Sequence, residues 1–458
     1  MSGPIDRTAP PPAGAFRPFR FPSFIKRRLP GGLTVYASRM TGVPLVSVEL
    51  SLRAGGNYDP AGLSGLATFT ASVIDEGTER RNSLEIAALV ERLGGYLVSA
   101  ADWDSGYIAV ALLAEHLDAG LDLLSEIALT PTFPEKEIAR LRQQRSAEIL
   151  RRGFEPGMQA DDRLLEMIYG GTPYVAPLIG REEDVRKLDR PTLVSFYESH
   201  YSLAGATVIA VGDLDPEELV RRIEGTLAPR AGQARAPEIP SIVPAPLEGI
   251  RVHILDRPGS AQTELRLGHA GIPRPHPDWV PLNVLNMALG GKFTSRINLN
   301  LRERHSYTYG ATTRLSARLG PGPFIVDTAV ATESAGAAAR EVLFELQRIR
   351  DEPVDGQELE ETLSYMIGVY PYTLQTVGDV AKRLEILALY GLPDDYYDSY
   401  PERLSAVTRE DMLRCATEHI HPDRLAITAV GPAELLLPQF EGVGEVTVQR
   451  REPEPAAV

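Results

Sequence analysis

The sequence contains a single cysteine, Cys415, which excludes a disulfide framework within the chain. Because the residues around Cys415 have a helical pattern, we interpret it as a buried structural thiol rather than a nucleophile. Uninterrupted apolar runs of about 18 residues are also missing, so the sequence predicts no membrane span. Residues 1–22 are rich in proline, glycine and alanine but lack the apolar segment of a signal peptide, which indicates a flexible tail. We therefore expect the chain in the cytoplasm, or in the periplasm if a leader has been removed.

Basic residues are outnumbered, since 47 Lys and Arg stand against 62 Asp and Glu, a net charge of −15. No basic cluster stands out beyond residues 26–28, so the charge argues against general nucleic-acid binding. The hydrophobic fraction of 43% and the charged fraction of 24% are those of a soluble globular protein. At about 100–200 residues for each domain, a chain of 458 residues predicts two to four domains.

Familiar catalytic motifs are missing as well. The eight histidines include no pair at the spacing of a helical metal site with a carboxylate between them. His419 and His421 stand two apart before a proline, and we expect them to be solvated or to cap a turn. There is no Gly-x-Ser-x-Gly elbow, no phosphate-binding loop and no pairing of cysteine with histidine. The residues by themselves nominate no active site.

Hydrophobic periodicity predicts an α+β protein. Alternating apolar and polar residues predict strands at 31–38, 46–54, 95–101, 106–113 and 206–212. Helical patterns occupy 65–74, 83–93, 117–129, 134–152, 160–169 and 190–197, with Ser83 as a plausible cap of the second helix. Neighbouring strands with helices bunched between them favour a largely antiparallel sheet packed with helices.

The order of elements recurs after a proline-rich stretch. Residues 107–141 are echoed by 324–360, and 196–212 by 415–431, so the chain is a duplicated domain of about 200 residues rather than a solenoid. The stretch between the copies suits an extended connector. We predict a tail at 1–22, a first domain at 23–230, a linker at 231–248, a second domain at 249–448 and a tail at 449–458.

Residues 289–310 carry the most chemistry in the sequence. Their pattern predicts a glycine-punctuated turn at Gly290 and Gly291, a helix that closes at Arg302, and a second turn that enters a strand near Tyr309. Arg302 and Tyr309 could together donate hydrogen bonds to a carbonyl oxygen or an oxyanion. The alternative is that Arg302 only interacts favourably with the negative end of the helix dipole, and that Tyr309 is an ordinary strand residue.

Several segments resemble one known family. Residues 53–67 and 75–78 are similar to the segments that flank a zinc motif, and 289–297, 301–303 and 307–310 resemble a second signature. Both signatures belong to the pitrilysin/insulinase family of zinc metallopeptidases, which includes the mitochondrial processing peptidases and their two-subunit bacterial relatives. The resemblance covers about residues 21–446 and implies two similar α+β domains that form half of a clamshell.

The chain departs from this family at the zinc motif. Active members carry His-x-x-Glu-His, where two histidines bind zinc and the glutamate activates its water, and a further glutamate on a later helix. The matching positions here are Thr68, Ala71 and Ser72, and Glu148 stands where the third ligand would be. The resemblance therefore implies no zinc in this chain and no catalysis by it alone, and we expect the zinc in a homologous partner subunit.

The second signature is intact. In the family, an arginine and a tyrosine from the other half of the enzyme hold the substrate's scissile carbonyl, and Arg302 and Tyr309 match those positions, with Gly290 and Gly291 beside them. The resemblance thus implies a non-catalytic subunit of a heterodimeric zinc peptidase that degrades peptides or unfolded polypeptide, with a substrate strand added at a sheet edge near residues 95–101. The alternatives are a proteolytically inactive scaffold and a peptide-binding homodimer.

Overall fold

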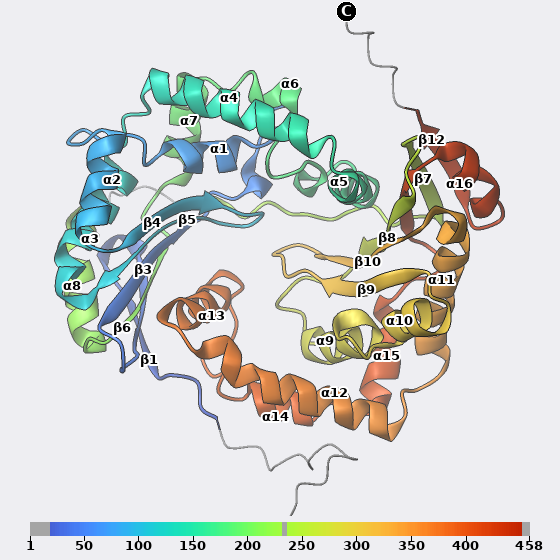
Figure 1. Ribbon diagram of the computed structural model, residues 1–458. Coiled ribbons are helices and arrows are strands. Elements are labelled where there is room, and N and C mark those ends of the chain that lie inside the picture. Colours follow the sequence, from blue (N-terminus) through green and yellow to red (C-terminus); the bar gives the residue numbers. More distant parts are fainter. Residues whose placement is uncertain (1–18, 231–235, 451–458) are drawn as a thin grey trace, which may run out of the picture.

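The computed structural model describes residues 19–230 and 236–450, which form two six-stranded sheets packed with helices (Figure 1). The first sheet has the order β1-β2-β6-β3-β5-β4 and the second the order β12-β7-β11-β8-β10-β9. The strands are β1 (Phe24–Arg28), β2 (Thr34–Arg39), β3 (Leu45–Leu52), β4 (Tyr96–Ala101), β5 (Gly106–Leu113), β6 (Thr207–Gly212), β7 (Arg251–Asp256), β8 (Gln262–Ala270), β9 (Thr308–Leu315), β10 (Pro323–Ala331), β11 (Ala426–Gly431) and β12 (Glu445–Gln449). The predicted fold class, α+β with two similar domains, is confirmed.

The two sheets repeat one topology. In the first sheet β2 pairs parallel with β6, and in the second β7 pairs parallel with β11. From β6 and from β11 outward, each of the next three strands pairs antiparallel with its neighbour, in the orders β6-β3-β5-β4 and β11-β8-β10-β9. The outermost strand differs, because β1 pairs antiparallel with β2, whereas β12 pairs parallel with β7. The sequence reading missed β1. The repeat places β4 and β9 at equivalent edges of the two sheets.

Helices cover the faces of both sheets, and their bounds agree well with the sequence periodicity. They are α1 (Leu66–Val73), α2 (Ser83–Arg92), α3 (Leu117–Leu129), α4 (Glu135–Arg152), α5 (Pro156–Tyr169), α6 (Glu182–Val185), α7 (Arg190–His200), α8 (Pro216–Leu227), α9 (Trp279–Asn286), α10 (Arg296–Asn298), α11 (Ala335–Asp351), α12 (Gly356–Val369), α13 (Val377–Leu389), α14 (Tyr400–Ser405), α15 (Arg409–His419) and α16 (Ala433–Phe440). Asn82, and not Ser83, caps α2, since its side chain accepts the Glu85 amide. Among the described residues, no helix is long and apolar enough to cross a membrane.

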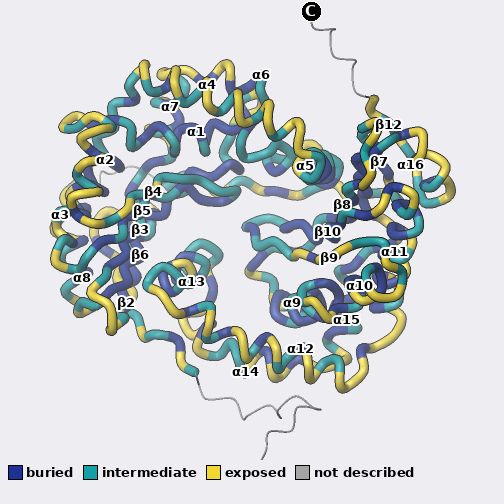
Figure 2. Tube along the Cα trace, in the orientation of Figure 1, coloured by how far each residue is buried: buried dark blue, intermediate teal, exposed yellow. Residues whose placement is uncertain are grey.

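Buried residues line the strands of both sheets and the inner faces of the helices, while exposed positions gather on the outer faces of helices such as α2, α4 and α12 (Figure 2). Cys415 is buried on α15, and burial raises the pKa of its thiol to about 12, as expected of a structural residue. Phe21 is also buried and stacks on Tyr397 at 5.3 Å between ring centroids, so the packed region begins inside the predicted tail at 1–22. Residues 1–18 and 451–458 of the predicted tails, and residues 231–235 of the predicted linker, lie outside the described residues.

Each half lends a helix to the sheet of the other half. Helix α5 of the first half packs on β8 and β11, and α13 of the second half packs on β3 and β6 (Figure 1). Leu164 and Ile168 on α5 are buried, and the Thr428 hydroxyl of β11 donates to the Ala160 carbonyl at 2.9 Å. The exchange makes the cores of the two halves mutually dependent.

Two hairpin turns lock the same interface. Arg318, between β9 and β10, is buried with its guanidinium 4.1 Å from the ring centroid of Trp103 and 4.5 Å from that of Tyr174. The Leu319 amide donates to Asp104 at 2.8 Å, and Asp104 lies in the turn between β4 and β5. A cation with aromatic partners and a carboxylate thus joins the two halves at their centre.

Beneath α13, two carboxyl groups face each other across the interface. Glu385 on α13 is buried, and Glu49 on β3 has one oxygen enclosed without a hydrogen-bond partner among the described residues. Burial raises the pKa of both carboxyls, and the charge of Glu385 raises that of Glu49 further. The Lys382 ammonium lies 2.5 Å from Glu385, so Glu49 is the member of the cluster without a bonded cation.

We predict that Leu164→Ala lowers the free energy of unfolding by about 2–5 kcal/mol, because it empties a buried site between α5 and the second sheet. The loss should appear in a single transition of the whole chain, followed in urea by the fluorescence of Trp103 and Trp279, one in each half. Leu150→Ala is the matched control, because Leu150 is 65% exposed and its truncation should change stability by less than about 0.5 kcal/mol. Two separate transitions, with only one shifted, would contradict the shared core.

We predict that Glu49→Gln flattens the pH dependence of stability. A glutamate ionises near pH 4.3 when unfolded, and the raised pKa of Glu49 makes the folded state bind the extra proton. Stability should therefore fall as pH rises above about 4.3 toward the folded pKa, by at most about 1.4 kcal/mol for each pH unit. Urea unfolding between pH 5 and 8 measures the slope, with the exposed Glu115→Gln as control. Equal slopes for both variants and the unaltered chain would refute the assignment.

Candidate functional site

The positions that match the zinc motif lie on α1 and offer no metal site. Thr68 donates its hydroxyl to the Leu178 carbonyl at 2.5 Å, and Ser72 donates to the Phe69 carbonyl of its own helix at 2.8 Å. Ala71 is buried and has no ligand atom. The side chains that α1 presents here are therefore engaged with backbone carbonyls or are apolar.

A guanidinium lies where these positions face α4. Arg145 on α4 donates from Nη1 to the Thr68 hydroxyl at 3.0 Å and to the Ile179 carbonyl at 3.3 Å, and its Cζ atom lies 5.7 Å from the centroid of the Phe69 ring. Burial lowers the pKa of Arg145, although an arginine stays protonated in proteins. Glu148, one turn further along α4, is exposed. A single carboxylate beside a fixed cation does not fit Zn²⁺.

A second cluster has the residue types of a metal site, but its ligand atoms are already engaged in hydrogen bonds within the protein. One ligand atom from each of His276, Asp278 and His419 lies within 4.8 Å of the others. However, the Asp278 carboxylate already accepts both Nη groups of Arg414, at 2.7 and 2.9 Å, and lies 2.8 Å from His419 Nε2. Arg414 and His419 hold the pKa of Asp278 well below its usual range. His419 thus contacts Asp278 and ties α15 to the start of α9, and it is not the solvated residue that we expected.

The glycine segment 287–291 is helical rather than a turn. It forms a π-helix, η6 (Met287–Gly291), and a second π-helix, η7 (Leu299–Arg304), follows α10. Gly290 approaches β9 so closely that a Cβ atom there would lie 2.7 Å from the Thr313 amide nitrogen, whereas a Cβ on Gly291 would meet the flexible Met287 side chain at 3.0 Å. Gly290 is therefore needed for packing against β9.

Arg302 and Tyr309 lie on adjacent elements, because η7 packs against β9. The Arg302 side chain is 37% exposed, with its guanidinium 4.6 Å from the centroid of the Phe293 ring and Nε 3.4 Å from a carboxylate oxygen of Glu303. Tyr309 is 87% exposed, and its side chain has no hydrogen bond or ring contact within 19–230 and 236–450. The two residues thus stand on elements that pack together, without a direct bond between their side chains.

Asn298 fixes this part of the surface, and the sequence reading missed it together with Phe293. The Asn298 amide donates to the Phe293 carbonyl at 2.6 Å and accepts the Ala311 amide of β9 at 3.0 Å. The segment that carries Phe293 is thus tied to the strand that carries Tyr309. An asparagine buried inside a helical stretch is a weak sequence signal, because only its distant partners give it a role.

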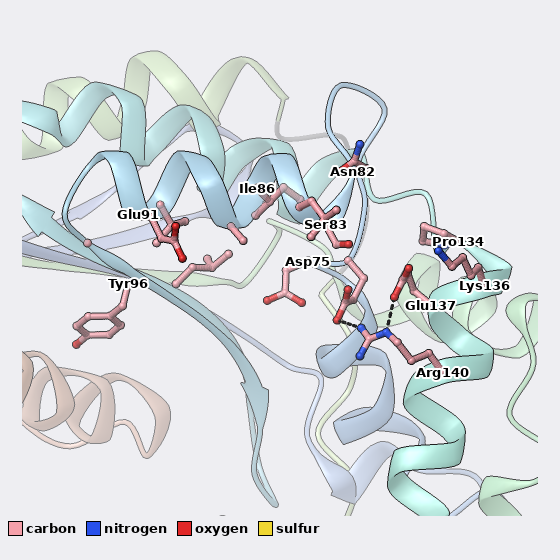
Figure 3. Close-up of a pocket in the computed structure, with 16 residues that line it drawn as sticks. Asp75, Asn82, Ser83, Ile86, Glu91, Tyr96, Pro134, Lys136, Glu137 and Arg140 are labelled. Atoms are coloured by element: carbon pink, nitrogen blue, oxygen red, sulfur yellow. Dashed lines mark hydrogen bonds and ion pairs between the residues drawn. The ribbon is translucent and has the colours of Figure 1, made fainter.

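The edge strand β4 borders a groove of about 980 Å³ (Figure 3). The groove lies between β4, α2 and the start of α4, and Tyr96 at its rim is exposed. Burial raises the pKa of Asp75, at its centre, to about 6. Arg140 is held by Glu76 and Glu137, each at 2.6 Å. An apolar and acidic groove thus accompanies the sheet edge that was predicted near residues 95–101.

The described residues combine a duplicated α+β fold with α1 positions that carry threonine, alanine and serine in place of a zinc motif. Residues 34–182 match the model of the insulinase family, Peptidase family M16, and residues 187–366 match that of the Peptidase M16 inactive domain. The chain belongs to the M16 peptidase family, which confirms the resemblance drawn from its signatures.

Some similar proteins are named zinc proteases and others are named non-peptidase homologues. A Streptomyces coelicolor protein named an uncharacterized zinc protease is 22% identical over 422 residues, 88% of each chain. The Helicobacter pylori protein named non-peptidase homolog YmxG is 21% identical over 387 residues, 82% of this chain and 87% of its own. A Pseudomonas fluorescens structure described as a peptidase M16 inactive domain has a TM-score of 0.84 at 24% identity, covering 90% of this chain and 98% of that one, and shares the fold.

We predict that Gly290→Ala destabilises the chain by about 1–3 kcal/mol, because the added methyl would collide with the backbone of β9. The matched control is Gly225→Ala in α8, where a Cβ atom meets nothing within 4 Å and the change should be neutral or stabilising by up to about 1 kcal/mol. Thermal unfolding compares the two. Equal stability of both variants would contradict the prediction, because it would mean that β9 and η6 can move apart to fit the methyl group without a loss in the free energy of unfolding.

Proposed function

We propose that this chain is the non-catalytic subunit of a two-subunit zinc metallopeptidase and that Arg302 and Tyr309 bind the substrate carbonyl in the partner's active site. One observation carries the proposal. The chain has no usable ligands at its own metal position, yet it presents a cation and a phenol on a supported, exposed surface. Donors of this kind have a use where an oxyanion develops nearby.

The surroundings of Arg302 suit this role. The Phe293 ring lies against the guanidinium and limits its motion, while leaving donor groups for a ligand. The Tyr309 hydroxyl has no internal partner in the described part of the chain, so a substrate oxygen would meet no competitor for it. A donor that stabilises an oxyanion contributes about 10²–10³-fold to the rate in well-studied enzymes.

The zinc of the complex would belong to a homologous partner subunit. There it would polarise the substrate carbonyl and activate water, while this chain contributes no metal ligand. The two subunits would form the halves of a clamshell around a peptide or an unfolded polypeptide. The open edge of β4 and its groove would add a strand-binding surface inside the chamber.

A peptide-binding homodimer is the second candidate. The groove beside β4 favours it, because this surface is complete within a single chain. A scaffold without peptide contact is less well supported, since a scaffold needs neither the exposed Tyr309 nor the open groove. Activity in a mixture with the partner separates these roles.

The test is peptide hydrolysis by this chain, by a zinc-bearing homologue that copurifies with it, and by the two mixed. We predict activity only in the mixture, and a loss of about 10²–10³-fold in kcat for Arg302→Ala with a smaller loss for Tyr309→Phe. Matched controls are Arg304→Ala in the same π-helix and Tyr372→Phe, both at exposed positions outside the pair.

Complex formation must be measured for every variant by size-exclusion chromatography, so that lost assembly is not mistaken for lost catalysis. Full activity of the partner alone, or mixtures indifferent to Arg302→Ala and Tyr309→Phe, would overturn the proposal. Peptide binding by this chain alone, without any hydrolysis in the mixture, would favour the homodimer.

A further inference from the structure

Arg145 is a half-buried cation that the proposed function does not use. It lies on α4, one turn before Glu148, and points toward α1 at the first position of the zinc motif. Its guanidinium and the Thr68 hydroxyl share one network, because Thr68 accepts from Arg145 and itself donates to the Leu178 carbonyl. Three segments of the chain meet at this point: α1, α4 and the residues before α6.

We propose that Arg145 is a built-in substitute for the metal ion, which cross-links α1 and α4 in its place and prevents a divalent cation from binding there. The inference concerns the metal position of this chain alone. It holds whether or not Arg302 and Tyr309 serve a partner, so the two proposals can fail separately.

The cross-link follows from the hydrogen bonds. A metal at the motif positions would join ligands of α1 to a ligand of α4, and the Arg145 guanidinium joins the same two helices through Thr68. It also reaches the Ile179 carbonyl at 3.3 Å, which extends the tie to a third segment. The Phe69 ring, buried in α1, lies against the guanidinium and shields these bonds from water.

The exclusion follows from charge. Arg145 keeps its proton at any pH at which the protein folds, and its guanidinium lies 3.0 Å from the side-chain oxygen at the first ligand position. A divalent cation at that position would meet this fixed charge in a partly buried site, where like charges repel more strongly than in bulk water. Loss of the histidines is therefore only part of the reason for metal-free folding.

The test restores the motif with Arg145 present or absent. One variant carries Thr68→His, Ala71→Glu and Ser72→His, the second adds Arg145→Ala, and the third adds Arg142→Ala in place of Arg145→Ala. Arg142 is the matched control, because it is one turn away on α4 and also donates to a backbone carbonyl, that of Leu188 at 3.0 Å. Zinc content after dialysis and zinc affinity by chelator competition are measured for all three.

We expect one zinc for each chain, bound tightly, only in the variant that lacks Arg145, with an affinity about 100-fold or more above the other two. Equal affinity with and without Arg145 would overturn the exclusion. Zinc binding in none of the three would also overturn it, because removal of the cation would then not have opened the site.

The cross-link is tested separately, by single substitutions in the chain that keeps Thr68, Ala71 and Ser72. The melting temperature of the unaltered chain should be unchanged by added zinc or by a chelator, and Arg145→Ala should lower it by about 3 °C or more beyond Arg142→Ala. Arg145→Lys should recover little of the loss, because an ammonium lacks the planar fork that reaches Thr68 and Ile179 together. A loss no greater than that of Arg142→Ala would refute the substitute role.

Discussion

The exchange of α5 and α13 between the two sheets is the constraint on which the rest of the molecule depends. Helix α13 joins Ile209 and Val211 of the first sheet to the core of the second half. Leu164 and Ile168 of α5 form a smaller cluster with residues of β10 and β11, so neither sheet is covered by its own half alone. Arg318, set among aromatic rings of the first half, fixes the hairpin β9–β10 against the turn after β4. The orientation of β9, and with it the place of Tyr309, is therefore set by residues more than 100 positions earlier in the chain.

The two halves repeat one sheet topology but present different side chains, at α1 in the first half and at η7 and β9 in the second. In the first half, α1 is packed through Phe69 and its other apolar residues, although its motif positions carry no metal-binding side chains. Its fold therefore needs only the buried side of α1. In the second half, η7 carries Arg302 against the Phe293 ring, and Asn298 ties the Phe293 segment to β9, the strand that carries Tyr309. One topology therefore presents different chemical groups in its two copies.

Local patterns in the sequence predict most of the elements but not their partners. Strands such as β5, with strictly alternating burial, and amphipathic helices can be identified from periodicity alone. The exchange of α5 and α13 cannot, because an apolar helix face does not reveal which sheet it covers. The same limit explains the site. Arg302 and Tyr309 were identified through a signature, whereas Arg145 and Asn298 acquire their roles from contacts at long range, with Thr68 and Ala311.

The bond between Asn298 and the Ala311 amide has a consequence for how many ligands the duplicated fold can hold. The sheets end in equivalent edges, β4 and β9, and a duplicated protein could in principle be bivalent. At β9, however, the amide of Ala311 that an incoming strand would need is already bonded to Asn298, and Gly290 is packed against Thr313. For strand addition the two equivalent edges are therefore unequal, because β9 has its Ala311 amide already bonded whereas β4 borders the groove.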